Sequence, residues 1–260
     1  MIHKTAIVDS KAKISSNVKI GPYSIIGPHV EIDADVIIQS HVNIVGHTTI
    51  GKNNRIYPLA SIGSDPQDLK YKGEKTSLII GTNNIIREHA TINTGTIQGG
   101  GITKVGNNNL IMIGAHIAHD CIIGNDIVMA NNSAVAGHAE IQDFVIIGAK
   151  CGIQQFTRIG KMAMIGGMTA VSRDVISYGL SIGNRNFLNG INVIGLRRDK
   201  VQNKEIIGLT EAYKEIFKSK NLSENLNKLN GKFKDNTLVK EVLEFINKDK
   251  KRPICTPYSD

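Results

Sequence analysis

Apolar residues recur at every sixth position along two long parts of the chain. Isoleucine, and once valine, holds each sixth position from Ile2 to Ile62, and a second run extends from Val105 to Val171. Four residues after most of these stands a small or β-branched residue, with Asn54 as an exception. A helix of period 3.6 cannot keep a six-residue repeat on one face, and a simple strand alternates by two.

Hexapeptide repeats of this kind form the short parallel strands of a β-helix, with one strand and one turn per repeat. The pattern resembles the left-handed hexapeptide-repeat family, and that resemblance implies a triangular prism with three hexapeptides, or eighteen residues, per coil. The sequence therefore predicts a mainly β protein, a left-handed parallel β-helix over residues 1–190. The handedness rests on the resemblance, because the spacing does not reveal it.

Two breaks in the repeat predict loops near 63–78 and 94–104. Ile62 and Ile80 are one coil's length apart, but the segment between them lacks aliphatic residues at the repeat positions. Ile92 and Val105 are thirteen residues apart, and the glycine-rich segment between them lacks the Gly-Lys-Ser/Thr spacing of a phosphate-binding loop. The second segment is therefore expected to be a turn.

Beyond residue 190 the repeat gives way to helical spacing, which predicts a basic α-helical region over residues 191–260. Apolar stripes run from Ile206 to Phe217 and from Val239 to Ile246, the second after a cap at Asn236 or Thr237. This region has fifteen Lys and Arg against ten acidic residues. At the end of a solenoid, such helices also cover the last strand edge.

Composition narrows the class of partner. The net charge is +8 and the pI about 9.3, so an acidic partner is plausible. Tryptophan is absent and aromatic residues are few, which disfavours single-stranded nucleic acid, and no apolar run reaches the length of a membrane span. Three cysteines at unrelated spacings and the lack of a signal peptide predict a cytoplasmic protein.

The segment "HIAHDC", residues 116–121, is the candidate for chemistry. In an eighteen-residue coil His119 stacks under Gly137 and Asp120 stacks under His138, while Gln155 continues the first column. A histidine, an adjacent carboxylate and a glycine amide have the composition of a general base, its orienting partner and an oxyanion donor. Cys121 falls at an inward position and is expected to be a core thiol.

Two other interpretations of these histidines stay open. One is a zinc site like that of the hexapeptide-repeat carbonic anhydrases, which place their histidines across a subunit boundary at a wider spacing. The other is a purely structural solenoid with histidines on its surface.

Several longer segments make the resemblance closer. "GGGITKVGNNNLIMIGAHIAHDCIIGN", "MANNSAVAGHAEI", "DLKYKGE" and "GLRR" occur in this order. The chain resembles, over nearly its whole length, the acyl-carrier-protein-dependent UDP-N-acetylglucosamine O-acyltransferases, which open lipid A biosynthesis. The resemblance implies transfer of a long-chain (R)-3-hydroxyacyl group from acyl carrier protein to the 3-hydroxyl of UDP-N-acetylglucosamine. It also implies a homotrimer and no cofactor or metal, and we expect neither nucleic-acid binding nor stable membrane insertion.

The resemblance also implies roles for individual residues. His119 would be the general base, Asp120 would fix its tautomer, and the Gly137 amide would hold the oxyanion. The implied substrate contacts are Asp68, Lys70, His116, His138, Gln155, Asn192 and Arg198. Gly167 and Arg185 would lie along the acyl chain.

The chain departs from that family's pattern at Gln154, Asp199 and Arg185. Gln154 leaves open a secondary electrostatic contribution to catalysis, and Asp199 leaves open one of the phosphate contacts. Arg185 leaves open which acyl chain length the protein prefers. A coenzyme A-dependent hexapeptide acetyltransferase remains an alternative, and so does an acceptor with a 3-amino group.

Overall fold

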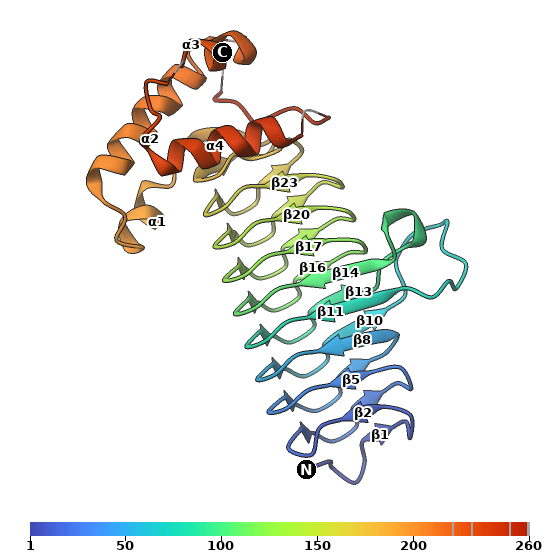
Figure 1. Ribbon diagram of the computed structural model, residues 1–260. Helices are drawn as coiled ribbons and strands as arrows, with labels where there is room; N and C mark the ends of the chain where they lie inside the picture. Colours follow the sequence, from blue (N-terminus) through green and yellow to red (C-terminus); the bar gives the residue numbers. More distant parts are fainter. Residues whose placement is uncertain (220, 230, 250, 259–260) are drawn as a thin grey trace.

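A computed structural model describes residues 1–219, 221–229, 231–249 and 251–258 of the chain. The chain is a left-handed parallel β-helix followed by helices, which confirms the predicted fold class. It winds through three sheets in turn, so that each coil adds one strand to each sheet, and the N-terminus lies at the end opposite the helices (Figure 1). Residues 220, 230, 250 and the last two of the predicted helical region lie outside the description.

The three sheets form the faces of the prism and are made of very short strands. The first sheet contains β1 (Ile7–Val8), β4 (Ile25–Ile26), β7 (Asn43–Ile44), β10 (Ser61–Ser64), β13 (Thr91–Asn93), β16 (His116–Ile117), β19 (Ala134–Val135), β22 (Gly152–Ile153) and β25 (Ala170–Val171). The second contains β2 (Lys13–Ile14), β5 (Glu31–Ile32), β8 (His47–Ile50), β11 (Ser77–Ile80), β14 (Ile102–Val105), β17 (Ile122–Ile123), β20 (Glu140–Ile141) and β23 (Arg158–Ile159).

The third sheet ends in an antiparallel pair at the top of the prism. It contains β3 (Lys19–Ile20), β6 (Ile37–Ile38), β9 (Arg55–Ile56), β12 (Ile85–Ile86), β15 (Leu110–Ile111), β18 (Val128–Met129), β21 (Ile146–Ile147), β24 (Met164–Ile165), β26 (Gly179–Ile182) and β27 (Phe187–Ile191). The last two strands run antiparallel to each other.

The repeated aliphatic residues fill the interior of the prism. Ile44, Ile62 and Ile117 are fully buried, and Ile44 pairs with Ile62, eighteen residues along. Cys121 and Cys151 are buried in the same core. Each coil turns its corners through residues with positive φ, among which asparagine and aspartate recur because their side chains tolerate that conformation.

Asn54, the exception in the sequence pattern, begins a buried ladder of three asparagines. Its side-chain oxygen accepts a hydrogen bond from the backbone N–H of Asn84 at 2.8 Å. The side-chain oxygen of Asn84 in turn accepts one from the backbone N–H of Asn109 at 2.9 Å. Each side-chain NH2 group donates to a backbone carbonyl at the same corner. These bonds satisfy polar groups that burial would otherwise leave unpaired.

The two predicted loops leave the prism on one side, opposite α1 in Figure 1. The first spans 65–76, and the second spans 94–101 and includes the 3-10 helix η1 (Ile97–Gly99). Ile62 pairs with Ile92, thirty residues along rather than eighteen, so the first loop adds twelve residues to its coil. Ile80 consequently lies on another sheet than Ile62, and their apparent one-coil spacing was misleading.

In the described part of residues 192–258, four helices follow the last strand: α1 (Val193–Arg198), α2 (Asn203–Ile216), α3 (Leu222–Lys228) and α4 (Thr237–Lys248). Asn236 caps α4, because its side chain accepts a hydrogen bond from the Val239 amide at 3.0 Å. The helices of the described residues include none that is long and apolar enough to cross a bilayer.

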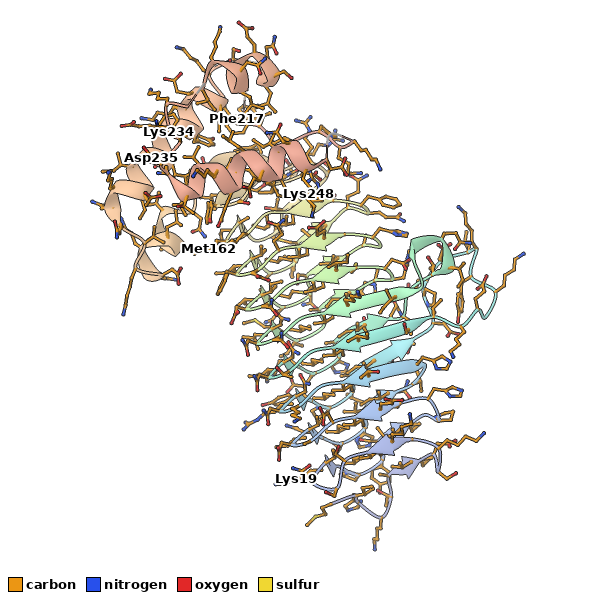
Figure 2. All side chains as sticks on the ribbon, in the orientation of Figure 1. Lys19, Met162, Phe217, Lys234, Asp235 and Lys248 are labelled. Carbon is orange, nitrogen blue, oxygen red and sulfur yellow. The ribbon has the colours of Figure 1, made fainter. Side chains whose placement is uncertain are left out.

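The buried guanidinium of Arg158 joins the helices to the prism. Arg158 Nε lies 2.7 Å from Asp174 Oδ2, and the Asp174 side chain is fully buried. The same guanidinium donates to the carbonyls of Phe245 and Asp249, at the end of α4. Lys248, labelled in Figure 2, reaches Glu140 on the second sheet at 3.0 Å.

The segment after α4 pairs with the last turns of the prism. Cys255 donates its amide hydrogen to the Asp174 carbonyl at 2.7 Å, and Leu188 donates to Thr256 at 2.9 Å. Backbone groups that would otherwise be open at the end of the solenoid are thus covered, as expected for a capping region.

Candidate active site

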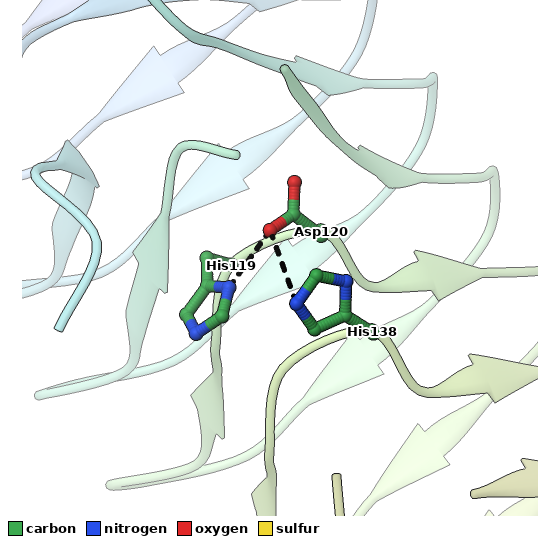
Figure 3. A group of neighbouring side chains, drawn as sticks. All are labelled: His119, Asp120 and His138. Atoms are coloured by element: carbon green, nitrogen blue, oxygen red, sulfur yellow. Dashed lines mark hydrogen bonds and ion pairs between the residues drawn. The ribbon is translucent and has the colours of Figure 1, made fainter. Parts of the chain in front are cut away.

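His119 and Asp120 lie at the corner between the first and second sheets, in the turn that joins β16 to β17. His116 pairs with Ala134, eighteen residues along, so the same register stacks Gly137 over His119 and His138 over Asp120. The His138 amide donates to the His119 carbonyl at 3.0 Å. Figure 3 shows the three side chains converging, with Asp120 between the two imidazole rings.

Asp120 orients the ring of His119. The His119 Nδ1 atom is 2.8 Å from Asp120 Oδ2, and the Asp120 side chain is fully buried. Because an ionised carboxylate only accepts hydrogen bonds, Nδ1 carries the proton and Nε2 carries the lone pair. Within the described part of the chain Nε2 has no hydrogen-bond partner, so it is the atom that can take a proton from a substrate.

The carboxylate of Asp120 is itself held by the second loop. Thr96 donates its amide hydrogen to Oδ1 at 2.7 Å and its hydroxyl to Oδ2 at 2.6 Å. The Asp120 amide donates to Thr103 Oγ1 at 2.8 Å, which fixes a backbone with a φ of 59°. The loop that looked like a mere turn therefore supplies the surroundings of the carboxylate.

Gly137 meets the edge of the His119 ring. A β-carbon at this position would lie 2.5 Å from Cε1 and 2.7 Å from Nε2, so any larger residue would have to displace the ring. Among the hydrogen bonds of the described residues, none has the Gly137 amide as donor. An amide without an acceptor, next to the imidazole edge, is free to donate to a substrate oxygen.

His116 and His138 flank the pair, and the pKa of each is lowered from that of an ordinary histidine. Burial lowers the pKa of His138, an effect that the charge of Asp120 opposes and His119 reinforces. The pKa of His116 is lowered by burial and by His119. His138 stacks on Phe156 with a ring-centroid distance of 4.5 Å, and His116 Nδ1 lies 2.7 Å from Thr91 Oγ1.

His119, Asp120 and His138 lie close enough together to form a metal centre. One ligand atom from each of His119, Asp120 and His138 lies within 4.8 Å of the others. Nδ1 of His119 donates to Asp120, and both oxygens of that carboxylate accept from Thr96, so the lone pairs left for a metal in this cluster are those of the His119 and His138 imidazoles. Two imidazoles are fewer than the three protein ligands of a catalytic zinc site, so the cluster fits an oriented base better than a zinc site.

The structure brings some other predicted residues near the pair. Asp68 and Lys70 lie on the first loop, where the Lys70 amide donates to the Asp68 carboxylate at 2.9 Å. The charge of Asp68 also acts to raise the pKa of His138, against the effect of burial. Gln155 is exposed one coil above Gly137, in the column predicted for it.

Four predicted residues lie elsewhere in the single chain. Asn192 caps α1 by accepting from the Gly195 amide, and it donates to the Met162 carbonyl at 2.9 Å. Arg198 ends the same helix, on the side of the prism away from the loops (Figure 1). Gly167 is exposed at the corner between the third and first sheets, and Arg185 is exposed in the turn between β26 and β27.

The sequence reasoning missed Thr96, Thr103 and Phe156. Phe156 follows His138 by eighteen residues, so the length of one coil could have predicted that the two stack. Thr103 lies seventeen residues before Asp120 and Thr96 twenty-four before it. Neither spacing stands out until the path of the second loop is known.

Comparison with known proteins gives one consistent result. The family described as UDP N-acetylglucosamine O-acyltransferase, domain 2, matches residues 174–255, and the bacterial transferase hexapeptide family matches residues 11–46 and 102–137. The chain is 50% identical over 246 residues to the acyl-[acyl-carrier-protein]–UDP-N-acetylglucosamine O-acyltransferase of Aliarcobacter butzleri, with 94% of each chain covered. It is 47% identical over 203 residues to the enzyme of that name from Nautilia profundicola, covering 78% of each.

A solved structure agrees with these relatives. The UDP-N-acetylglucosamine O-acyltransferase of Moraxella catarrhalis superposes with a TM-score of 0.94 at 44% identity, over 97% of this chain and 98% of that one. Similarity thus extends through both the prism and the helices.

Proposed function

Because the chain belongs to the family of acyl-[acyl-carrier-protein]–UDP-N-acetylglucosamine O-acyltransferases, we propose that it performs the family's reaction in lipid A biosynthesis. It is an acyltransferase that moves a long-chain (R)-3-hydroxyacyl group from acyl carrier protein to the 3-hydroxyl of UDP-N-acetylglucosamine. The observation that carries the residue assignments is the 2.8 Å contact from His119 Nδ1 to Asp120, which leaves Nε2 as the base.

The proposed steps use atoms already described. Nε2 of His119 removes the proton of the sugar hydroxyl as its oxygen attacks the thioester carbonyl carbon. The carbonyl oxygen becomes an oxyanion, which the Gly137 amide stabilises, while Asp120 stabilises the imidazolium. Collapse of the intermediate re-forms the carbonyl, breaks the carbon–sulfur bond and expels the carrier's thiolate. The imidazolium returns its proton to that sulfur.

The remaining predicted residues are proposed as substrate contacts. His116, His138 and Gln155 lie around the base, and Asp68 and Lys70 lie on the first loop. The guanidinium of Arg198 suits a diphosphate, because its planar fork can bind two oxygens at once. Its distance from His119 in one chain is what a site shared between subunits requires.

We therefore propose a homotrimer with each site between neighbouring prisms. The outward side chains of the third sheet are apolar over five successive coils, in strict register: Ile85, Leu110, Val128, Ile146 and Met164. An apolar stripe of this length is typical of a face that packs against another protein. Sedimentation should give about three times the chain mass of 28.2 kDa, and a stable, fully active monomer would refute the shared site.

Charge and cysteines support the choice of donor and compartment. The helical region is basic, and a basic surface attracts an acidic carrier protein. All three cysteines are buried and unpaired, which supports the cytoplasmic location that we propose.

One assay separates this function from its rivals. The purified protein is incubated with labelled UDP-N-acetylglucosamine and either a 3-hydroxyacyl carrier protein or the matching acyl-coenzyme A. The proposal predicts O-acylated sugar nucleotide from the carrier protein and little from coenzyme A. Efficient transfer from acetyl-coenzyme A would favour a small-molecule acetyltransferase, and transfer only to the 3-amino analogue would correct the acceptor.

A further inference from the structure

Thr96 gives both of its hydrogen-bond donors to one carboxylate. Its amide and its hydroxyl reach the two different oxygens of Asp120, at 2.7 and 2.6 Å, and its side chain is buried with 1% exposure for the residue. Two bonds from a single residue fix both the position and the plane of the carboxylate. The same carboxylate then fixes the ring of His119.

Gly99 closes the other side of the carboxylate. A β-carbon on Gly99 would lie 2.0 Å from Cγ of Asp120, so the backbone of η1 lies directly over the carboxyl group. The Gly99 amide also donates to Thr96 Oγ1 at 3.2 Å, which fixes the direction of the hydroxyl. The Asp120 side chain is consequently fully buried and bonded to Thr96 and His119.

The loop that carries Thr96 is anchored at its base. Thr94 accepts the hydroxyl of Thr76 at 3.0 Å, and the Gly95 amide donates to the Ser77 carbonyl at 3.2 Å. These bonds tie the start of the second loop to the end of the first. Thr96 is therefore presented to Asp120 by a braced segment, and its place does not depend on the dyad alone.

We propose that Thr96 is a positioning residue of the acyl transfer, acting through Asp120 on His119. This rests on the proposed function of the dyad. Hydrogen bonds to an anion stabilise its charged form, so the two bonds from Thr96 spread the charge of Asp120. They hold the carboxylate where it keeps the proton of His119 on Nδ1, and they limit how strongly it stabilises the imidazolium.

Removing one of these bonds should shift the His119 titration in one direction, and a general loosening of the fold would not produce that shift. Thr96→Val keeps the shape and the amide bond but deletes the hydroxyl bond. The charge of Asp120 is then less dispersed and attracts a proton on His119 more strongly, so the ring titrates at higher pH. The other titratable groups that face the pair, His116, His138 and Asp68, are unchanged in the variant.

The test compares the parent enzyme with Thr96→Val, Thr96→Ser and Thr157→Val. Thr157 is a fully buried threonine whose Oγ1 has no partner within the described residues, so its replacement controls for the exchange itself. Thr96→Val should lower kcat about tenfold, as removal of a residue behind a functional histidine commonly does, with KM values unchanged. Thr96→Ser and Thr157→Val should match the parent.

Two further readouts distinguish the role. The acidic limb of the kcat/KM–pH profile, and the midpoint of the His119 ring titration followed by ¹⁵N NMR, should both move to higher pH in Thr96→Val only. An unchanged kcat and midpoint in Thr96→Val, or equal losses in Thr96→Ser, would overturn the proposal. If the parent transfers no acyl group, the proposed function fails, and the NMR midpoint alone decides the role of Thr96.

A second variant covers the case in which Thr96→Val does not fold. Gly99→Ala must push η1 away from Asp120, because its β-carbon has no room beside the carboxylate. The same upward shift of the His119 midpoint is expected there. An unchanged midpoint in a folded Gly99→Ala protein would count against the proposal.

Discussion

The Cε1–Nε2 edge of the His119 ring lies against Gly137, so closely that a β-carbon on the glycine would be 2.5 Å from Cε1. The eighteen-residue coil produces this contact, since it stacks residue 137 on residue 119. The contact places the Nε2 edge of the ring beside a glycine whose amide has no acceptor among the described residues. The proposed base and the proposed oxyanion donor thus come from the same pair of neighbouring turns.

Gly137→Ala should therefore lower kcat by about a hundredfold or more. The new methyl group has to displace the imidazole, and a shift of about 1 Å in a reacting group costs on that order. Thermal unfolding should change little beyond the effect of Gly152→Ala, where a β-carbon meets nothing within 4 Å. A Gly137→Ala enzyme with parental kcat would show that the ring does not need this contact.

Gly167→Met tests the proposed acyl groove. A β-carbon on Gly167 meets only the Ala149 backbone, at 3.4 Å or more, so the variant should fold. If the acyl chain passes this corner, methionine shortens the groove by about four methylenes, which are worth roughly 3 kcal/mol or about a hundredfold in selectivity. Relative kcat/KM values for donors of different lengths should shift toward shorter chains. An unaltered chain-length profile would mean that another residue limits the length of the acyl chain, and Arg185 would be the next to test.

The sequence predicts the fold correctly wherever the six-residue repeat continues without interruption. It predicted the prism because buried residues such as Ile44 and Ile117 keep the six-residue phase. The first loop adds twelve residues, a multiple of six, so the phase continued and Ile62 appeared to lie one coil from Ile80. Asn54 looked like an exception because Asn84 and Asn109 are displaced from it by the loops.

In the site too, the repeat places some residues, and contacts between loops place the others. Register alone placed His138 over Asp120 and Gly137 over His119. Thr96 reaches Asp120 through a loop whose path depends on its bonds to the other loop, which no period encodes. For this reason the stacking of the four residues around the proposed base was predictable from the sequence, and the hydrogen bonds behind the Asp120 carboxylate were not.

Lowering the pH should destabilise the protein through His138. Burial lowers its pKa in the folded state, so below about pH 6.5 the unfolded chain binds a proton that the folded chain does not. The free energy of unfolding must then fall as the pH drops through that window. Unfolding midpoints of the parent and of His138→Gln, compared at pH 7.5 and 5.5, should show a smaller loss for the variant. Equal losses would mean that burial of His138 has no such effect.

The Arg158–Asp174 pair should be essential for docking the helices. Arg158→Ala leaves the fully buried carboxylate of Asp174 without its nearest partner, which costs about 3–5 kcal/mol. Lys13→Ala is the matched control, because Lys13 holds the equivalent outward position on the second sheet but pairs with Glu31 in solvent. That exposed pair should contribute less than about 1 kcal/mol. Similar shifts of the urea midpoint for both variants would contradict the account.

The most direct test of the account is the kcat of His119→Ala with acylated carrier protein and UDP-N-acetylglucosamine, in buffer containing a chelator. If His119 is the base, kcat falls by about 10²–10⁴-fold, the KM of each substrate stays close to that of the parent, and the chelator leaves the parent unaffected. His3→Ala, a change at an exposed histidine near the N-terminus, should keep full activity. A His119→Ala enzyme that retains parental kcat, or a parent that loses activity to the chelator and regains it with zinc, would contradict the proposed mechanism.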